Sequence, residues 1–200
     1  MYSIETRQFG QYAKAFRLFN KQGMQVVLTD IGGRIVHILL PVEEKGGLRN
    51  VSLACFSVED YITYVPYVGA SIVPVAGRLF TKQLQIRGQV LQLLENGPGY
   101  SLHSWPKAAN LQIWEMNCIS ATNRIVFSIC LADGYNGFPG PISVQATYQL
   151  CEDNTLEVHY QANSEGPTLF NPTNQVFSII QVIFKRVLVN INYRYQLIEY

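Results

Sequence analysis

Residues 142–150 read ISVQATYQL, and after the turn CEDN residues 155–163 read TLEVHYQAN. In both runs apolar and polar side chains alternate with a period of two, the spacing of a strand with one face buried and the other in water. The Asp and Asn residues between the runs tolerate tight turn conformations. The sequence therefore predicts an antiparallel hairpin over these residues.

Similar short segments recur along the chain, separated by Gly, Pro, Asn and Asp. Further strands are expected at residues 25–28, 34–40, 84–86, 89–93, 111–119, 125–131 and 187–197. A short helix is expected at Val58–Tyr64, with Ser57 as its N-cap and Asp60 three residues later. Many short strands joined by turn residues are typical of an all-β sandwich or barrel, and we expect one domain over residues 1–200.

Composition excludes several classes of protein. Of the 200 residues, 48% are hydrophobic and 14% are charged, which suits a folded domain with a sizeable core. The formal net charge is +1 and Lys and Arg form no run, so nucleic-acid and anionic-membrane partners are not expected. The first residues lack the basic start and apolar core of a secretory signal, and the apolar runs are too short to span a bilayer. We expect a cytoplasmic protein.

The four cysteines predict neither a metal site nor a disulfide framework. They are Cys55, Cys118, Cys130 and Cys151. None belongs to a CxxC pair and no His stands at metal-ligand spacing from them, so buried reduced thiols are expected. The strand pattern at 187–197 runs almost to Tyr200, and an edge strand there would favour self-association.

Four other segments combine turn residues with polar and aromatic side chains. They are GASIVPVAGRL at 69–79, ENGPGYSLHSWPK at 95–107, DGYNGFPG at 133–140 and PTLFNPTNQVF at 167–177. In order and approximate spacing, they are similar to the motifs of the aldose 1-epimerase (galactose mutarotase) family. The resemblance covers about residues 5–180. It implies a large antiparallel β-sandwich of the galactose mutarotase type, of which this chain is expected to be the N-terminal three-fifths, truncated at its C-terminal side.

The resemblance also implies a reaction. Members of the family are isomerases that interconvert the α and β anomers of an aldohexose such as galactose or glucose, without a cofactor. A base removes the proton of the anomeric hydroxyl while an acid protonates the ring oxygen, so the ring opens and closes again. Each positioned proton donor or acceptor typically contributes about 10²–10⁴-fold in rate. A small sugar is thus the implied partner, and the sequence leaves open which sugar or sugar phosphate.

Carried over residue by residue, the resemblance implies a set of site residues. His103 takes the position of a loop histidine that acts at the ring oxygen, and Arg78 that of an arginine that holds sugar hydroxyls. Gln175 stands where the family has its principal acid histidine. Asn96 and Trp105 are further candidates for substrate binding, through an amide hydrogen bond and through stacking on a sugar face. For each residue, a packing or loop-orienting role is the alternative.

Two features leave the activity open. A glutamine amide at position 175 can bind a hydroxyl but does not titrate. The family's later Asp and Glu would lie beyond Tyr200. Three hypotheses therefore remain: an active mutarotase, a catalytically impaired carbohydrate-binding relative, or a truncated fragment.

Overall fold

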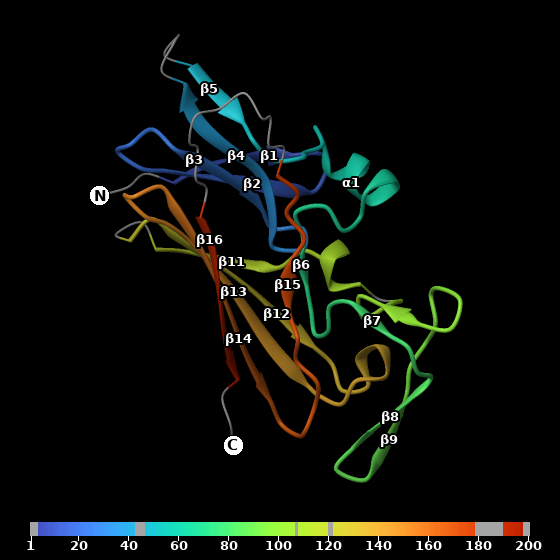
Figure 1. Ribbon diagram of the computed structural model, residues 1–200. Helices are drawn as coiled ribbons and strands as arrows, with labels where there is room; N and C mark the ends of the chain where they lie inside the picture. The colour runs from blue at the N-terminus through green and yellow to red at the C-terminus, as the bar shows by residue number, and fades with distance from the viewer. Residues whose placement is uncertain (1–3, 43–46, 107, 120–121, 179–189, 198–200) are drawn as a thin grey trace.

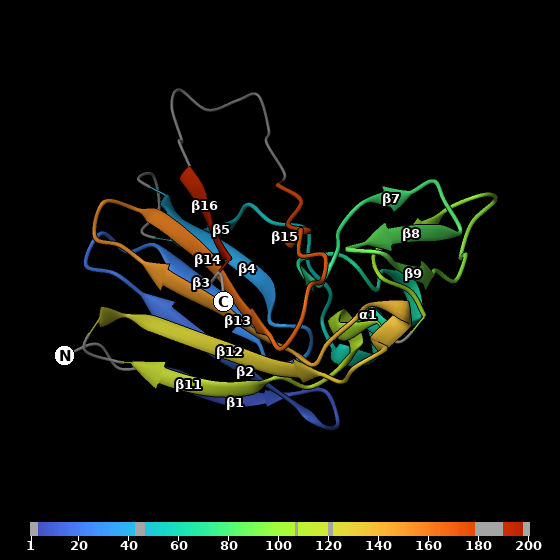
Figure 2. The same ribbon diagram turned by 90° about the horizontal axis from the view of Figure 1, so that it is seen from below.

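The structure is a computed structural model that describes residues 4–42, 47–106, 108–119, 122–178 and 190–197. Two five-stranded sheets face each other as the layers of a sandwich (Figures 1 and 2). The first sheet follows chain order and consists of β1 (Glu5–Phe9), β2 (Ala13–Phe19), β3 (Gln25–Thr29), β4 (Arg34–Val42) and β5 (Gly47–Asn50). The second consists of β11 (Glu115–Ile119), β12 (Arg124–Leu131), β13 (Ile142–Leu150), β14 (Thr155–Ser164) and β16 (Asn190–Leu197).

The predicted hairpin forms the centre of the second sheet. Strands β13 and β14 pair antiparallel from Ile142 opposite Ser164 to Leu150 opposite Leu156. Alternate side chains of β13 are buried as the period of two predicts. The buried row packs against β2 to β4 of the other sheet, and the rings of Phe16 and Phe127 lie 5.9 Å apart between the layers. The predicted all-β sandwich is therefore confirmed.

Short elements gather at one end of the sandwich (Figure 2). They are α1 (Val58–Tyr64), β6 (Ser71–Ile72), β7 (Arg78–Leu79), β8 (Gln83–Ile86), β9 (Gln89–Gln92), β10 (Ser101–Leu102) and β15 (Thr173–Asn174), with 3₁₀ turns at Ala109–Leu111 and Tyr135–Gly137. Helix α1 has the predicted bounds, and the Ser57 hydroxyl accepts a hydrogen bond from the Asp60 amide at its first turn. Strand β6 pairs with β15, β7 with β10, and β8 with β9.

Several expectations need correction. The strand expected at 111–119 begins only at Glu115, because Ala109–Leu111 forms a 3₁₀ turn whose Ala109 carbonyl accepts the Trp114 indole N–H at 2.9 Å. Strand β16 pairs with β14 in parallel, whereas the other strand neighbours described in the two large sheets are antiparallel. Residues 187–189 of the expected C-terminal strand lie outside the described residues.

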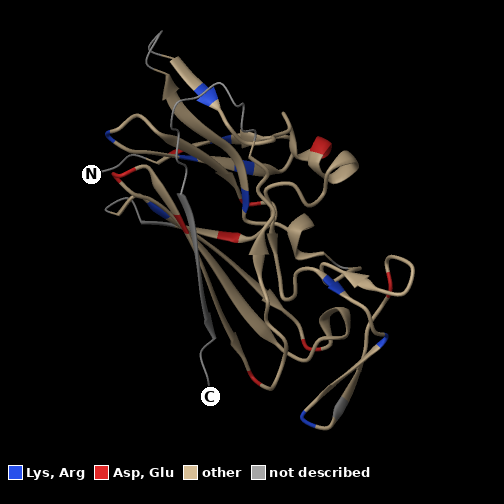
Figure 3. Cartoon of the chain, in the orientation of Figure 1, with Lys and Arg blue, Asp and Glu red and all other residues tan. Residues whose placement is uncertain are grey.

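The cysteine prediction is wrong for Cys130, which is exposed. Successive side chains of a strand point to opposite faces, and Phe127 and Leu131 of β12 point into the core. Cys130 therefore points to the other face, where its thiol is exposed to water. Cys55 and Cys151 are half-buried, and the side chain of Cys118 lies outside the described residues. Lys and Arg residues are scattered along both sheets and the β7 to β9 region (Figure 3). The described helices are all too short or too polar to cross a membrane.

Candidate functional site

The four segments that carry the family resemblance meet at the end of the sandwich where β6, β7 and β15 lie (Figure 1). Residues 69–79 are central. On one side they pair with 171–175, through β6–β15 and through backbone hydrogen bonds between Gly69 and Gln175 and between Ala76 and Asn171. On the other side they pair with 101–104. Segment 133–140 joins through the Asn136 amide, which donates to the Ser104 carbonyl.

Arg78 and His103 are brought together by the β7–β10 pairing. Arg78 lies opposite Leu102, so His103 follows immediately beyond the end of the ladder. The His103 amide donates to the Gly77 carbonyl at 3.1 Å, and the Gly77 amide donates to the imidazole Nδ1 at 3.2 Å. Gly77 has a φ of +86°, a conformation that an L side chain adopts only with strain, and this conformation turns both of its polar groups to His103.

The hydrogen bond from Gly77 sets the tautomer of His103. Because Nδ1 accepts a hydrogen bond from the Gly77 amide, the neutral imidazole carries its own hydrogen on Nε2. Burial, and secondly the positive charge of Arg78, lower the pKa of His103 from its ordinary value of 6.5. Near neutral pH the side chain is therefore an uncharged donor at Nε2, next to an exposed guanidinium.

The backbone of this loop is strained. His103 and Ser104 have φ values of +58° and +55°, in the left-handed region that non-glycine residues seldom occupy. The Ser104 hydroxyl holds the turn by accepting from the Val75 amide at 2.9 Å and donating to the Val75 carbonyl at 2.8 Å. Conformations of this kind cost about 1–3 kcal/mol each and cluster at functional sites, which supports a functional role for the loop.

The other three candidates occupy different positions. Both ends of the Asn96 amide bind the backbone of Leu102, at 3.0 and 2.6 Å, so the side chain closes the loop that ends at His103 and the loop-orienting alternative is favoured. Trp105 follows the turn and stays 38% exposed. Gln175 is half-buried, and its backbone bonds to Gly69 and Ala70, two and three residues beyond Tyr67.

Two aromatic residues that the sequence did not assign to the site flank the pair. The Tyr67 ring lies 4.8 Å from the imidazole of His103, tilted by 52°. The guanidinium carbon of Arg78 lies 5.1 Å from the centre of the Tyr100 ring, within cation–π range. Tyr100 could have been found from the register, because it precedes Ser101 on the strand opposite Arg78. The contact of Tyr67 with His103 could not be found in this way, because it depends on the tertiary position of the loop at residues 66–68.

A buried arginine holds the Tyr67 loop. Arg34 on β4 has no exposed surface, and its guanidinium donates to the carbonyls of Pro66, Val68 and Asn110. Its Cζ also lies 4.3 Å from the centre of the Tyr61 ring. Burial lowers the pKa of Arg34 to about 10, so the side chain remains a cation at neutral pH. Backbone dipoles and an aromatic face, rather than a described carboxylate, stabilise this charge.

A second buried network anchors β6 and β15 to the large sheet. The Ser71 hydroxyl lies 2.8 Å from both the Tyr148 and the Tyr160 hydroxyls. The Asn174 amide donates to the Tyr148 hydroxyl at 3.1 Å and to the Gly69 carbonyl at 2.9 Å. Strands β13 and β14 thus fix the two short strands, and the loops that they carry.

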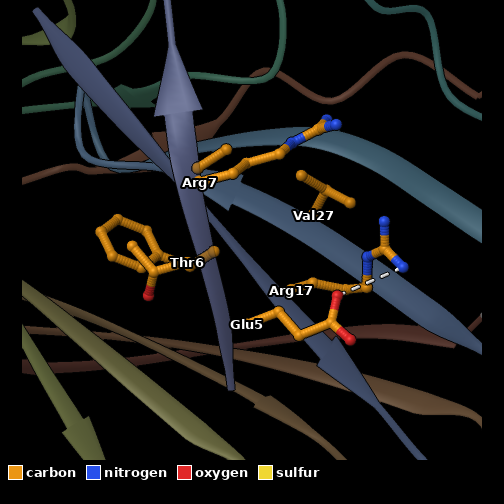
Figure 4. Close-up of a pocket in the computed structure, with 7 residues that line it drawn as sticks. Glu5, Thr6, Arg7, Arg17 and Val27 are labelled. Carbon is orange, nitrogen blue, oxygen red and sulfur yellow. Dashed lines mark ion pairs between the residues drawn. The ribbon is translucent and has the colours of Figure 1, made fainter.

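A pocket on the first sheet is separate from these loops in the chain. It is lined by Glu5, Thr6, Arg7, Ala15, Phe16, Arg17 and Val27 (Figure 4). Glu5 and Arg17 lie opposite each other in the β1–β2 pairing and form an exposed ion pair of 3.4 Å. The pocket shares no residue with the four segments, so it is not part of the candidate site.

The two facing sheets and the loops that converge at their end are those of a β-sandwich of the galactose mutarotase type. The crystal structure of galactose 1-epimerase from Lactobacillus acidophilus is similar, with a TM-score of 0.77 and 24% sequence identity, over 89% of this chain and 53% of that one. At this identity the likeness concerns the fold.

The chain belongs to the aldose 1-epimerase family, whose model matches residues 14–177. The aldose 1-epimerase of Haemophilus influenzae is 32% identical over 161 residues, 80% of this chain and 46% of that protein. The Escherichia coli aldose 1-epimerase is 29% identical over 169 residues, 84% of this chain and 48% of that protein. The chain spans about half the length of these curated relatives.

Proposed function

We propose that the chain binds the pyranose ring of an aldohexose at Arg78 and His103, and interconverts its α and β anomers by acid/base ring opening. The observation that carries the proposal is the placement of both side chains at one end of the β7–β10 ladder. The Arg78 guanidinium offers several N–H donors to sugar hydroxyls. The His103 imidazole offers one directed donor, Nε2–H, whose orientation the Gly77 amide sets.

In the proposed reaction, His103 acts at the ring oxygen. As the C1–O5 bond breaks, negative charge develops on this oxygen, and a hydrogen bond from the uncharged Nε2–H stabilises it while solvent water supplies the proton that the oxygen takes up. The proton of the anomeric hydroxyl leaves to solvent water acting as the base, and reversal of these steps after rotation of the aldehyde gives the other anomer. No described residue is assigned as that base.

A second candidate function, sugar binding without acceleration, rests on Gln175. The motif resemblance of residues 167–177 implies that this residue stands at the position of the family's principal acid, and an amide can hold a hydroxyl but cannot transfer a proton near neutral pH. The two candidates share a binding site and differ in whether anomers exchange faster in the presence of the protein.

An anomer-exchange experiment tests the proposal. The chain is mixed with freshly dissolved α-D-galactose or α-D-glucose, and the α and β signals are followed by NMR or polarimetry. We expect exchange faster than in buffer, and its loss in His103→Ala. His159→Ala is the matched control, since His159 is a half-buried histidine on the polar face of β14 and belongs to none of the four segments.

The outcomes separate the hypotheses. Acceleration that His103→Ala removes and His159→Ala keeps supports the mutarotase. Exchange at the buffer rate, with sugar binding detected by saturation-transfer NMR, supports the binding function instead. If neither exchange nor binding occurs, both proposals are wrong.

A further inference from the structure

The loop that carries Tyr67 follows helix α1 and is held through its backbone. The guanidinium of Arg34 donates to the carbonyls of Pro66 and Val68, the residues on either side of Tyr67. The Tyr67 carbonyl itself accepts from the Ala70 amide at 3.0 Å. The peptide groups around Tyr67 are thus bound to β4 and to the chain that leads into β6, which fixes where its aromatic side chain begins.

The 3₁₀ turn at Ala109–Leu111 holds the same loop. Arg34 also donates to the Asn110 carbonyl, and the Asn110 side-chain amide donates to the Pro66 carbonyl at 2.8 Å. Burying a guanidinium costs free energy, which these hydrogen bonds offset only if every partner stays in place. The buried cation therefore opposes any displacement of the two carbonyls that flank Tyr67.

The side chain that this loop presents lies against His103. The centres of the Tyr67 ring and the imidazole are 4.8 Å apart, with a tilt of 52°, and both side chains are half-buried. The Gly77 amide, which donates to Nδ1, comes from the other neighbouring segment. A hydrogen bond to one nitrogen still lets the imidazole rock about that bond, whereas a packed aromatic ring restricts this motion. The Gly77 contact thus selects the tautomer, and the Tyr67 contact sets the plane of the ring.

We infer that Tyr67 is a positioning residue for His103: its ring, held in place by Arg34, keeps the imidazole in one orientation, so that Nε2–H points in a fixed direction. The inference rests on the proposed function, in which this N–H stabilises the oxygen that ring opening releases. A donor aimed in advance stabilises such a charge better than one that must first be ordered.

The proposed role belongs to the ring of Tyr67 and not to its hydroxyl. Burial raises the pKa of the phenol above its ordinary value of 10.0, so the phenol does not act as a base near neutral pH. A phenylalanine offers the same aromatic surface to the imidazole. Tyr67→Phe should therefore retain the role, and Tyr67→Ala should remove it.

NMR of the His103 imidazole tests the contact in the wild type, Tyr67→Ala, Tyr67→Phe and the control Tyr64→Ala. Tyr64 is 74% exposed at the end of α1. Nitrogen-15 shifts report the tautomer, and their pH dependence gives the pKa. In the wild type we expect the proton on Nε2 and a pKa below 6.5. In Tyr67→Ala the imidazole loses part of its cover, so its pKa should rise toward 6.5 and both tautomers should appear. The other two variants should match the wild type.

Anomer exchange of α-D-galactose is measured on the same four proteins. Misplacement of a catalytic group by about 1 Å can cost about 100-fold in rate, so we expect kcat to fall about 10- to 100-fold in Tyr67→Ala. KM should change little, because Tyr67 acts on the imidazole and not on the sugar. Tyr67→Phe should restore the kcat of the wild type, and Tyr64→Ala should keep it.

The inference is overturned if Tyr67→Ala keeps the wild-type pKa and tautomer of His103, or keeps the kcat of an active wild type. It is also overturned if Tyr67→Phe has the same effects as Tyr67→Ala. A wild type that exchanges anomers no faster than buffer refutes the proposed function, whereas the imidazole signals still show whether Tyr67 holds His103. Unfolding midpoints check that the variants are folded, and Tyr67→Leu replaces Tyr67→Ala if the alanine variant is not.

Discussion

At the scale of single residues, His103 shows how backbone contacts define a side chain's chemistry. The Gly77 amide points at Nδ1, so a proton on that nitrogen would meet another N–H. This contact opposes the imidazolium, as do burial and the charge of Arg78, which lower the pKa of His103. The uncharged form is thus the one that the folded protein stabilises.

We therefore predict that the His103 imidazole titrates below its ordinary pKa of 6.5. Since the unfolded chain binds this proton more readily than the folded one, the contribution of His103 to stability is present above pH 6.5 and is lost as the pH falls through its lowered pKa. Two-dimensional NMR of the imidazole C–H signals measures the midpoint, with His103→Ala for assignment. A midpoint above 6.5 would contradict the proposed tautomer and environment.

Arg34 gives a second prediction at this scale. In Arg34→Met the carbonyls of Pro66, Val68 and Asn110 lose their buried donor, and we expect a loss of about 3 kcal/mol or more in the free energy of unfolding. The control is Arg17→Met, which removes only a partly exposed ion pair and should cost at most about 1 kcal/mol. Chemical denaturation measures both. Equal losses of unfolding free energy in the two variants would show that the buried hydrogen bonds of Arg34 stabilise the protein no more than an exposed ion pair does.

At the scale of elements, the short strands β6 and β15 depend on the large sheet. Two residues on each strand supply few hydrogen bonds of their own. The hydroxyls of Ser71, Tyr148 and Tyr160 connect them to β13 and β14, and Gly69 at the start of this region approaches the Ile35 carbonyl so closely that a Cβ would lie 2.0 Å from it. The site loops are thus fixed by contacts from the sandwich, not by local structure.

We predict that Tyr148→Phe destabilises the protein by about 1–3 kcal/mol, because the Ser71 hydroxyl and the Asn174 amide lose a partner in a buried place. Tyr12→Phe is the control, since Tyr12 is 51% exposed. Thermal and urea unfolding of the two variants gives the difference. An unchanged stability in Tyr148→Phe would mean that the network does not anchor β6 and β15.

At the scale of the whole molecule, the two sheets share one main hydrophobic core. Side chains of β2 to β4 and of β12 to β14 interdigitate, so neither sheet can lose its partner without exposing the apolar face of the other. Phe16 of the first sheet also packs on Phe127 of the second, with ring centres 5.9 Å apart. These contacts between the sheets support the proposal that the chain is a single domain.

We accordingly predict one cooperative unfolding transition. Far-UV circular dichroism reports the strands of both sheets, and tryptophan fluorescence reports the core through Trp114, which is 1% exposed. The two signals should give the same denaturant midpoint, as in a two-state transition. Two separate midpoints would show that the sheets unfold independently and would count against a single domain.

Much of the fold follows from local patterns. The bounds of α1 follow from its cap and apolar spacing, and β13 and β14 follow from alternation around a polar turn. The alternation of polar and apolar residues does not locate a strand end where a turn interrupts it, as the 3₁₀ turn at Ala109–Leu111 does before β11. It was also silent on strand direction, which for β16 depends on its pairing with β14.

The amino-acid sequence was enough to predict the all-β class, the hairpin at the centre of the second sheet and the candidate residues His103 and Arg78, because each depends on side-chain period or on a local motif. The three-dimensional fold was needed to show that Gly77 orients the imidazole, that Tyr67 packs on it and that the Tyr100 ring lies beside the Arg78 guanidinium. These contacts join segments that are separated along the chain, so their geometry is set by strand register and by buried anchors such as Arg34 and Tyr148.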